Sequence, residues 1–218
     1  MRLNFSLTDG SIKFDKVTIL TLEDPRTFSE LTSSFYNYGP DGPLKLVFDD
    51  YKPLKENQVM VVSDILSYNI NTPSILKQVY ADLEGQLNEK LEVKNELDLL
   101  AAKIAEIIAV ECLENQLDLE YDEITVLELL KIMGVKLEEK TLSIYEKCYE
   151  IVQIYKYLSK KELLVFLNVG AYLTEEQFKK IVEYIELCGI NALFVEPRKL
   201  YEFPQYILDS DYYLEKYE

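Results

Sequence analysis

Alternating apolar and polar residues predict β-structure at the start of the chain. In residues 1–22 the apolar positions, Leu7 among them, alternate with polar ones on both sides of a turn signal at Asp9-Gly10. A helix is predicted over 25–38, because a proline opens it and apolar residues then recur at helical spacing. Further strands are predicted for two short apolar runs, 44–48 and 59–62.

The middle of the chain changes to the spacing of amphipathic helices. From Pro73 to about Leu117, apolar residues recur at steps of three and four, which places a stripe along one helical face. We expect a break near Asn88. The stripe is formed by Leu76, Val79, Leu83 and Leu87, and then by Leu97, Leu100, Ile104 and Ile107. Two more helices are predicted, a short one ending at Gly134 and one from Thr141 to Leu158.

Strand character returns in the last third of the chain. Leu163 to Leu167 and Ala192 to Val195 are buried-strand runs, and a helix that starts at a capping box separates them. Continuous apolar strands that alternate with helices favour a sheet covered on both faces and parallel in its core. We therefore predict an α/β head formed by residues 1–63 and 159–218, with an elongated α-helical leg inserted over 64–158.

Composition narrows the chemistry that this fold can perform. The 218 residues carry a formal charge of −16 and no histidine, which removes the commonest general base and metal ligand. Three cysteines far apart in apolar surroundings indicate core thiols rather than a disulfide framework. The acidic balance alone indicates a solubilising surface, basic protein partners or divalent cations, and argues against nucleic acid.

Nucleotide hydrolysis has neither of its sequence elements. The loop after the first long strand, Glu23-Asp24-Pro25-Arg26-Thr27, has no glycine or lysine to hold phosphates, and it presents two carboxylates instead. The strand that ends at Leu167 is followed by Asn168, where a magnesium-binding aspartate would be needed. No nucleophile elbow is present either. We expect a binding protein that is not an enzyme.

A dense run of carboxylates between residues 111 and 128 is the most distinctive polar feature. Hard oxygen ligands packed in a loop between two helices suit calcium, although the glycine and spacing of an EF-hand are absent. The plain alternative is a solvated acidic turn in which Asp122 caps the next helix. The N-terminus lacks the apolar region of a signal peptide and no uncharged stretch is long enough to span a membrane, so we expect a cytoplasmic protein.

The same acidic stretch carries a family resemblance. Residues 111–125, together with Leu3-Asn-Phe-Ser-Leu, Ala81-Asp-Leu-Glu84, the block 155–161 and the block 196–209, resemble the accessory protein of type II-A CRISPR loci. This is the Csn-family protein that is needed for acquiring new spacers. The similarity spans the whole chain in register.

The resemblance implies a specific function. It implies a head related to nucleotide-binding sheets that cannot use ATP, structural Ca²⁺ with no nucleotide, and a ring-shaped homotetramer. The ring threads double-stranded DNA ends through a lysine-lined hole and acts with the integrase proteins and effector nuclease of its locus. Given the resemblance, we predict Glu120, Asp122, Glu123 and Glu128 as calcium ligands and Lys52, Lys55, Lys131 and Lys136 as DNA-binding residues.

An acidic chain holds DNA only if its lysines are gathered on one face, within a Debye length of about 8 Å of the phosphates. For each lysine alone, a solvated surface charge is the simpler interpretation.

Two other hypotheses stay open. The second hypothesis is an acidic interaction scaffold for the nuclease and integrase proteins, with DNA binding secondary. The third is a degenerate or active ATPase, which measured nucleotide binding would revive.

Overall fold

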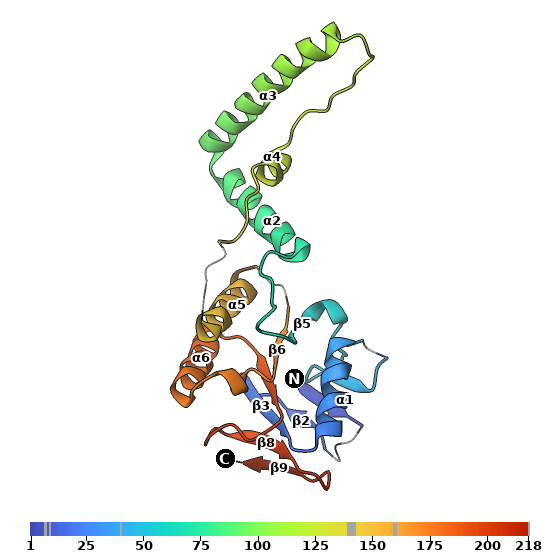
Figure 1. Cartoon of the computed structure of the whole chain (residues 1–218), viewed down its shortest axis with the longest axis vertical. Coiled ribbons are helices and arrows are strands. Elements are labelled where there is room, and N and C mark those ends of the chain that lie inside the picture. Colours follow the sequence, from blue (N-terminus) through green and yellow to red (C-terminus); the bar gives the residue numbers. More distant parts are fainter. Residues whose placement is uncertain (7, 9, 40, 139–142, 159–160, 218) are drawn as a thin grey trace. The chain divides into compact units, whose positions relative to one another are not determined.

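The fold consists of two compact units. A computed structural model describes residues 1–218 except 7, 9, 40, 139–142, 159–160 and 218 (Figure 1). The first unit contains Met1–Tyr68 and Thr141–Glu218, and the second contains Asn69–Lys140. The predicted alternation at Leu7, the turn at Asp9 and the helix start at Thr141 lie outside the described residues.

A six-stranded sheet forms the centre of the first unit. Its strand order is β5-β6-β7-β3-β8-β9, with parallel pairing from β5 to β8 and an antiparallel last strand. The parallel, two-faced sheet predicted from the apolar runs is confirmed. The strands are β3 (Val17–Leu22), β5 (Val59–Val62), β6 (Leu163–Leu167), β7 (Ala192–Glu196), β8 (Gln205–Leu208) and β9 (Leu214–Tyr217).

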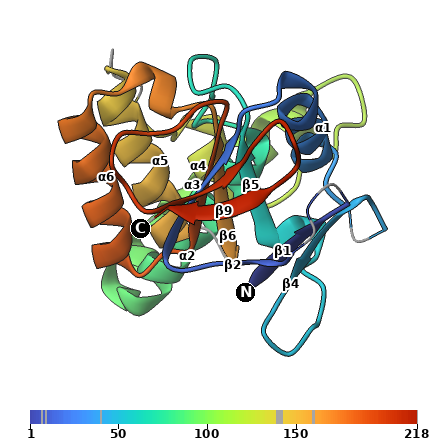
Figure 2. The same ribbon diagram turned by 90° about the horizontal axis from the view of Figure 1, so that it is seen from below.

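Different elements cover the two faces of this sheet. Helix α1 (Pro25–Tyr36) and a small antiparallel sheet pack on one face, and helices α5 (Ile144–Leu158) and α6 (Glu175–Cys188) pack on the other (Figure 2). On the α5–α6 side, stacked rings of Phe166 and Phe194 contact the edge of Phe178. The small sheet has the order β2-β1-β4, from β1 (Arg2–Phe5), β2 (Ile12–Lys13) and β4 (Leu44–Val47).

The second unit is helical and has little core of its own. Helix α2 (Pro73–Glu89) is followed by α3 (Leu91–Glu114) after a break at Lys90, close to the break predicted near Asn88. A short α4 (Val126–Ile132) packs on both. The Asn71 side chain closes the unit, because it accepts from the Leu137 amide at 2.9 Å and donates to the Leu137 carbonyl at 3.1 Å.

The insertion is shorter than we predicted. We placed its end at residue 158, but α5 belongs to the first unit. The reason is packing: Cys148, Ile151 and Val152 are fully buried in the cluster that α5 forms with α6 and the sheet. The apolar period predicted the helix α5 correctly, but the prediction that it belongs to the insertion was wrong.

Candidate calcium-binding and DNA-binding residues

The N-terminus of α1, where a nucleotide-binding fold holds phosphate, is occupied by a carboxylate. One oxygen of Asp24 accepts hydrogen bonds from the Thr27 amide at 2.8 Å and from the Thr27 hydroxyl at 2.9 Å. These bonds, the amide bond first, lower the pKa of Asp24. A helix N-terminus attracts anions through its unpaired N–H groups. Here Asp24 takes that position itself, and its charge repels a phosphate.

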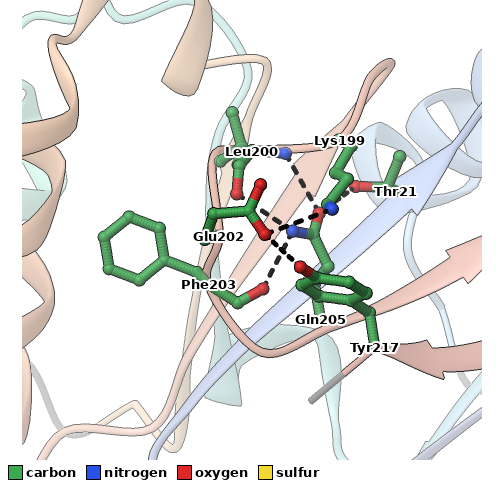
Figure 3. A network of polar contacts seen from close by, with 7 residues as sticks. All are labelled: Thr21, Lys199, Leu200, Glu202, Phe203, Gln205 and Tyr217. Carbon is green, nitrogen blue, oxygen red and sulfur yellow. Dashed lines mark hydrogen bonds and ion pairs between the residues drawn. The ribbon is translucent and has the colours of Figure 1, made fainter.

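A buried glutamine fastens the loop that follows β7 to the neighbouring strand β3. The Gln205 side-chain oxygen accepts from the Thr21 hydroxyl at 2.9 Å and from the Leu200 amide at 3.0 Å. Its nitrogen donates to the carbonyls of Leu200 and Phe203, both at 2.9 Å (Figure 3). The amide thereby uses both its donors and its acceptor, and fixes the loop at the carboxyl end of the sheet.

The same loop is tied to β9 by an exposed group. The Tyr217 hydroxyl donates to Glu202, and the Lys199 ammonium lies 3.6 Å from that carboxylate (Figure 3). The ammonium also lies 3.5 Å from the centroid of the Tyr217 ring. Together with Gln205, these contacts position residues 197–204 by side chains from β3, β8 and β9.

A buried carboxyl group ends the central strand β7. Glu196 is fully buried, and burial raises its pKa to about 7. One carboxyl oxygen accepts from the Gly170 amide at 2.8 Å, and the other has no hydrogen-bond partner among the described residues. The residue pattern does not single out Glu196, because a charge at the end of an apolar run usually lies in a solvated loop.

The four predicted calcium ligands are exposed carboxylates and do not form a site among the described residues. Glu120, Asp122 and Glu123 lie in the irregular segment 115–125 that joins α3 to α4. Across the parts of the chain that the structure describes, no three His, Cys, Asp or Glu side chains gather closely enough to hold a metal ion. Their chemistry suits Ca²⁺, but one chain does not assemble them into a site.

Glu128 forms hydrogen bonds with Thr125 at the start of α4. Its carboxylate accepts from the Thr125 amide at 2.8 Å and from the Thr125 hydroxyl at 2.7 Å, which lowers its pKa, chiefly through the amide bond. The Thr125 hydroxyl in turn accepts from the Glu128 amide, which completes a capping box at the start of α4. Thr125 therefore caps this helix, and the alternative cap Asp122 does not.

The predicted DNA-binding lysines are divided between the two units. Lys52 and Lys55 belong to the first unit, and Lys131 and Lys136 flank Gly134 in the second. All four are exposed. Lys52 forms an ion pair with Asp50 at 2.7 Å, and that hydrogen bond raises the pKa of the lysine.

Helix α3 exposes an apolar surface that periodicity alone did not predict. It has 24 residues, and of these only Ala101 is buried. Helix α4, which packs on α3, spans only seven residues and cannot cover it. The exposed apolar residues of α3, which we call the α3 surface, include Leu99, Leu100, Ile104, Ile107, Ile108, Val110 and Leu113, with exposures from 48% to 85%. Among the described residues, no helix combines the length and apolarity that crossing a membrane requires.

The fold and its side chains define an α/β protein with a parallel sheet covered by helices, a carboxylate-capped α1 and an inserted helical unit. Comparison with known proteins gives the family. The family described as "CRISPR-associated protein (Cas_Csn2)" matches residues 37–212, and the chain belongs to this family. The expected membership, stated from the residue blocks above, is confirmed.

Individual relatives agree over the full length. The chain is 52% identical to the CRISPR-associated protein Csn2 of Streptococcus agalactiae over 214 residues, which cover 98% of this chain and 97% of the relative. It is 44% identical to the Csn2 of Enterococcus faecalis, with 98% of each chain covered. The crystal structure of Stu0660 of Streptococcus thermophilus shares the fold, with a TM-score of 0.57 at 13% identity, over 100% of this chain and 76% of that one.

Proposed function

We propose that the chain forms a ring-shaped homotetramer that binds the ends of double-stranded DNA in a calcium-dependent manner. It supports the acquisition of new spacers in CRISPR adaptive immunity and performs no catalysis itself. Membership of a CRISPR-associated family supports a role in the CRISPR system. The observation that carries the assembly is the α3 surface.

The α3 surface supports self-association on physical grounds. Leu113 and Leu99 are 85% and 72% exposed, and five further aliphatic residues of the same helix are about half exposed. Each fully buried side chain of this kind contributes about 1.5–3 kcal/mol. Contiguous exposed apolar surfaces of this sort mark interaction sites in water-exposed proteins. Burial against further copies of the chain removes this surface from water.

DNA binding by such an acidic assembly requires charges of opposite sign to be segregated. Four chains of −16 each carry a formal charge of −64. At physiological salt a phosphate interacts mainly with charges within about 8 Å, so nearby lysines outweigh distant carboxylates. We assign this role to Lys52, Lys55, Lys131 and Lys136. Contacts of this kind are with phosphates, so they are independent of sequence and weaken as salt increases.

We assign calcium binding to the acidic segment between α3 and α4. Glu120, Asp122 and Glu123 are exposed oxygen donors there, and Glu128 contributes a carboxylate that also serves the α4 cap. Because no three of these groups gather within one chain, the ligand set is completed only when the segment rearranges or when chains associate. Bound Ca²⁺ lowers the repulsion between acidic segments and thereby favours assembly.

The acidic surface itself favours one alternative function. The exposed carboxylates of segment 115–125 suit basic patches on other proteins, which supports a scaffold for the integrase proteins and effector nuclease of the locus. Co-purification of these partners after nuclease treatment distinguishes the two functions. Contacts that survive removal of DNA support the scaffold, and contacts that vanish were bridged by DNA.

Two measurements test the leading proposal. Light scattering at micromolar concentration, with calcium and with a chelator, is expected to give the mass of four chains when calcium is present. Gel shifts of a short linear duplex under the same conditions are expected to show binding with calcium only, and a closed circle of the same sequence is the control for ends. A monomeric mass under every condition contradicts the proposal.

A further inference from the structure

The strand β5 is an unprotected edge of the large sheet. Its residues Val59, Met60, Val61 and Val62 are all apolar, and among the described strands it pairs only with β6. The opposite edge, β9, carries Glu215 and Lys216. Charged residues at an edge prevent a further strand from pairing there. β9 has this protection and β5 does not.

A groove lies along the α1 side of β5. It has a volume of about 1040 Å³ and is lined by Val59 and Val61 of the strand, by Phe35 and Tyr36 of α1, and by Lys55 and Lys161. Tyr36 is 73% exposed beside it. A smaller hollow of about 380 Å³ shares Tyr36 as a wall and reaches Ser63 and Asn168, which follow β5 and β6. The two hollows accompany the whole length of the edge strand.

The groove combines apolar side chains of β5 and α1 with two lysines near the start of β5. Lys161 is half-buried there, and its ammonium donates to the Val59 carbonyl at 2.8 Å. Burial lowers the pKa of Lys161, while the charge of Glu56 acts in the opposite direction. Lys55 lines the same end. Two lysines against one glutamate give this groove a positive charge in a chain whose formal charge is −16.

We propose that β5 and this groove bind an extended acidic segment of a partner protein, which adds a strand to the edge of the sheet. Main-chain hydrogen bonds to β5 supply affinity in this mode of binding, and side chains at alternate positions of the added strand enter the groove. A carboxylate of the segment pairs with Lys161 and Lys55. Four residues of β5 span about 13 Å, so the segment needs four to six residues in extended form.

Charge and shape favour this occupant over the others. A partly desolvated ammonium is stabilised by a carboxylate more than a fully exposed one is, because the local dielectric is lower. The groove follows a strand with no hydrogen-bonded outer neighbour, which suits a peptide backbone. The inference concerns the head of the protein and is independent of calcium and of the α3 surface; Lys55 is the one residue that it shares with the proposed DNA-binding set.

The test uses phage-displayed random peptides selected on the full-length chain, with counter-selection on a variant whose edge strand is blocked. The blocking change is Val61→Glu, at a half-buried position in the wall of the groove, where an added negative charge repels an acidic segment. The enriched sequences are expected to alternate β-branched and polar residues and to carry Asp or Glu. A synthetic peptide of the most enriched sequence is then titrated by calorimetry.

Two matched lysine variants decide whether the charge is used. Lys161→Met is expected to weaken the peptide by about tenfold. Lys147→Met is the control, since the Lys147 ammonium also donates to a backbone carbonyl, that of Leu66, at 2.8 Å but lies outside the groove. It is expected to leave the affinity unchanged. Circular dichroism and thermal melting confirm that both variants fold.

Three outcomes overturn the proposal. The first is enrichment that does not depend on Val61, and the second is a set of neutral or basic peptides. The third is a change in oligomeric mass in Val61→Glu, which identifies a second copy of the chain as the occupant of the edge. DNA gel shifts of the same variants are expected to match the wild type, so failure here is distinguishable from failure of the DNA-binding proposal.

Discussion

The Gly170 amide donates a 2.8 Å hydrogen bond to one carboxyl oxygen of the buried Glu196. A Cβ added at Gly170 would lie 2.5 Å from Leu200 Cδ2 and 3.1 Å from the carboxyl carbon of Glu196. Glycine is required here for space. The carboxyl group is buried away from water, and this burial raises its pKa to about 7.

Replacing Glu196 by glutamine should make the stability less dependent on pH. The folded pKa of about 7 lies above the ordinary 4.5, so wild-type stability is full below pH 4.5 and falls as the pH rises through 7. Glutamine has the same shape and never ionises. We expect Glu196→Gln to match the wild type near pH 4 and to exceed it at pH 8 by up to about 3 kcal/mol. Urea unfolding at both pH values measures this, with Glu176→Gln as a surface control; an equal difference at both pH values contradicts it.

Removing the Gln205 amide should destabilise the first unit strongly. Gln205→Leu removes all four bonds of this amide, so the Leu200 amide and the Phe203 carbonyl lose the bond that each makes here. The Thr21 hydroxyl and the Leu200 carbonyl keep only long bonds of 3.4 Å, to the Arg198 carbonyl and from the Phe203 amide. Each unsatisfied buried group costs about 1–3 kcal/mol, so we expect a total loss of about 3 kcal/mol or more. Thr21→Val removes one of the four bonds and should cost about 1 kcal/mol. Denaturant midpoints measure both, and equal losses would show that the network does not act through Gln205.

A charge on the α3 surface should block assembly without unfolding the chain. Ile107 is 58% exposed, so Ile107→Glu creates little strain within one chain. It places a charge in any interface formed there, and we expect at least about a tenfold loss in the association constant. Asn95→Glu, at an exposed polar position of the same helix, is the matched control because it adds the same single negative charge. Light scattering gives the mass; a tetramer that survives Ile107→Glu places the interface elsewhere.

Calcium binding and helix capping should respond differently to changes at Glu123, Glu128 and Thr125. Glu123→Gln removes an exposed carboxylate, so we expect weaker calcium binding and an unchanged melting temperature in chelator. Glu128→Ala should weaken calcium binding and also reduce the helicity of α4, because it removes the carboxylate that accepts two bonds from Thr125. Thr125→Ala should change helicity alone. Calorimetry and circular dichroism give the two readouts, and calcium binding that is unaffected by either glutamate change rejects these ligands.

The lysines beside Gly134 should contribute to DNA affinity through charge only. Lys131→Ala with Lys136→Ala is expected to weaken binding to any duplex sequence equally and to reduce the salt dependence by about 0.9 per lost phosphate contact. The control is Lys179→Ala, an exposed lysine of α6 that we assign no role. Titrations at several salt concentrations measure the slope. A slope identical to that of the wild type excludes these two residues.

Apolar periodicity predicted the sheet well because each core strand is buried on both faces. The runs at 163–167 and 192–195 are continuous and apolar, which leaves few alternatives to a covered parallel sheet. Periodicity does not identify the partner of a helical face. For this reason α5 was assigned to the insertion, and the exposure of Ile107 on α3 could not be foreseen.

The polar side chains were harder to predict, since their meaning depends on distant contacts. Gln205 and Thr21 are far apart in the sequence and bond within the first unit. The carboxylates of segment 111–128 are dense along the chain but do not gather in space, because irregular backbone sends neighbouring side chains in different directions. The capping box of Thr125 and Glu128 was accessible, since its residues are three apart.

The position of Asp24 restricts how this chain can change over time. A substitution that created a phosphate-accepting loop here would have to remove the carboxylate on which the start of α1 depends. Such a mutant would lose a helix cap before it gained a ligand. The Asp24 cap thus opposes any gain of phosphate binding at this loop.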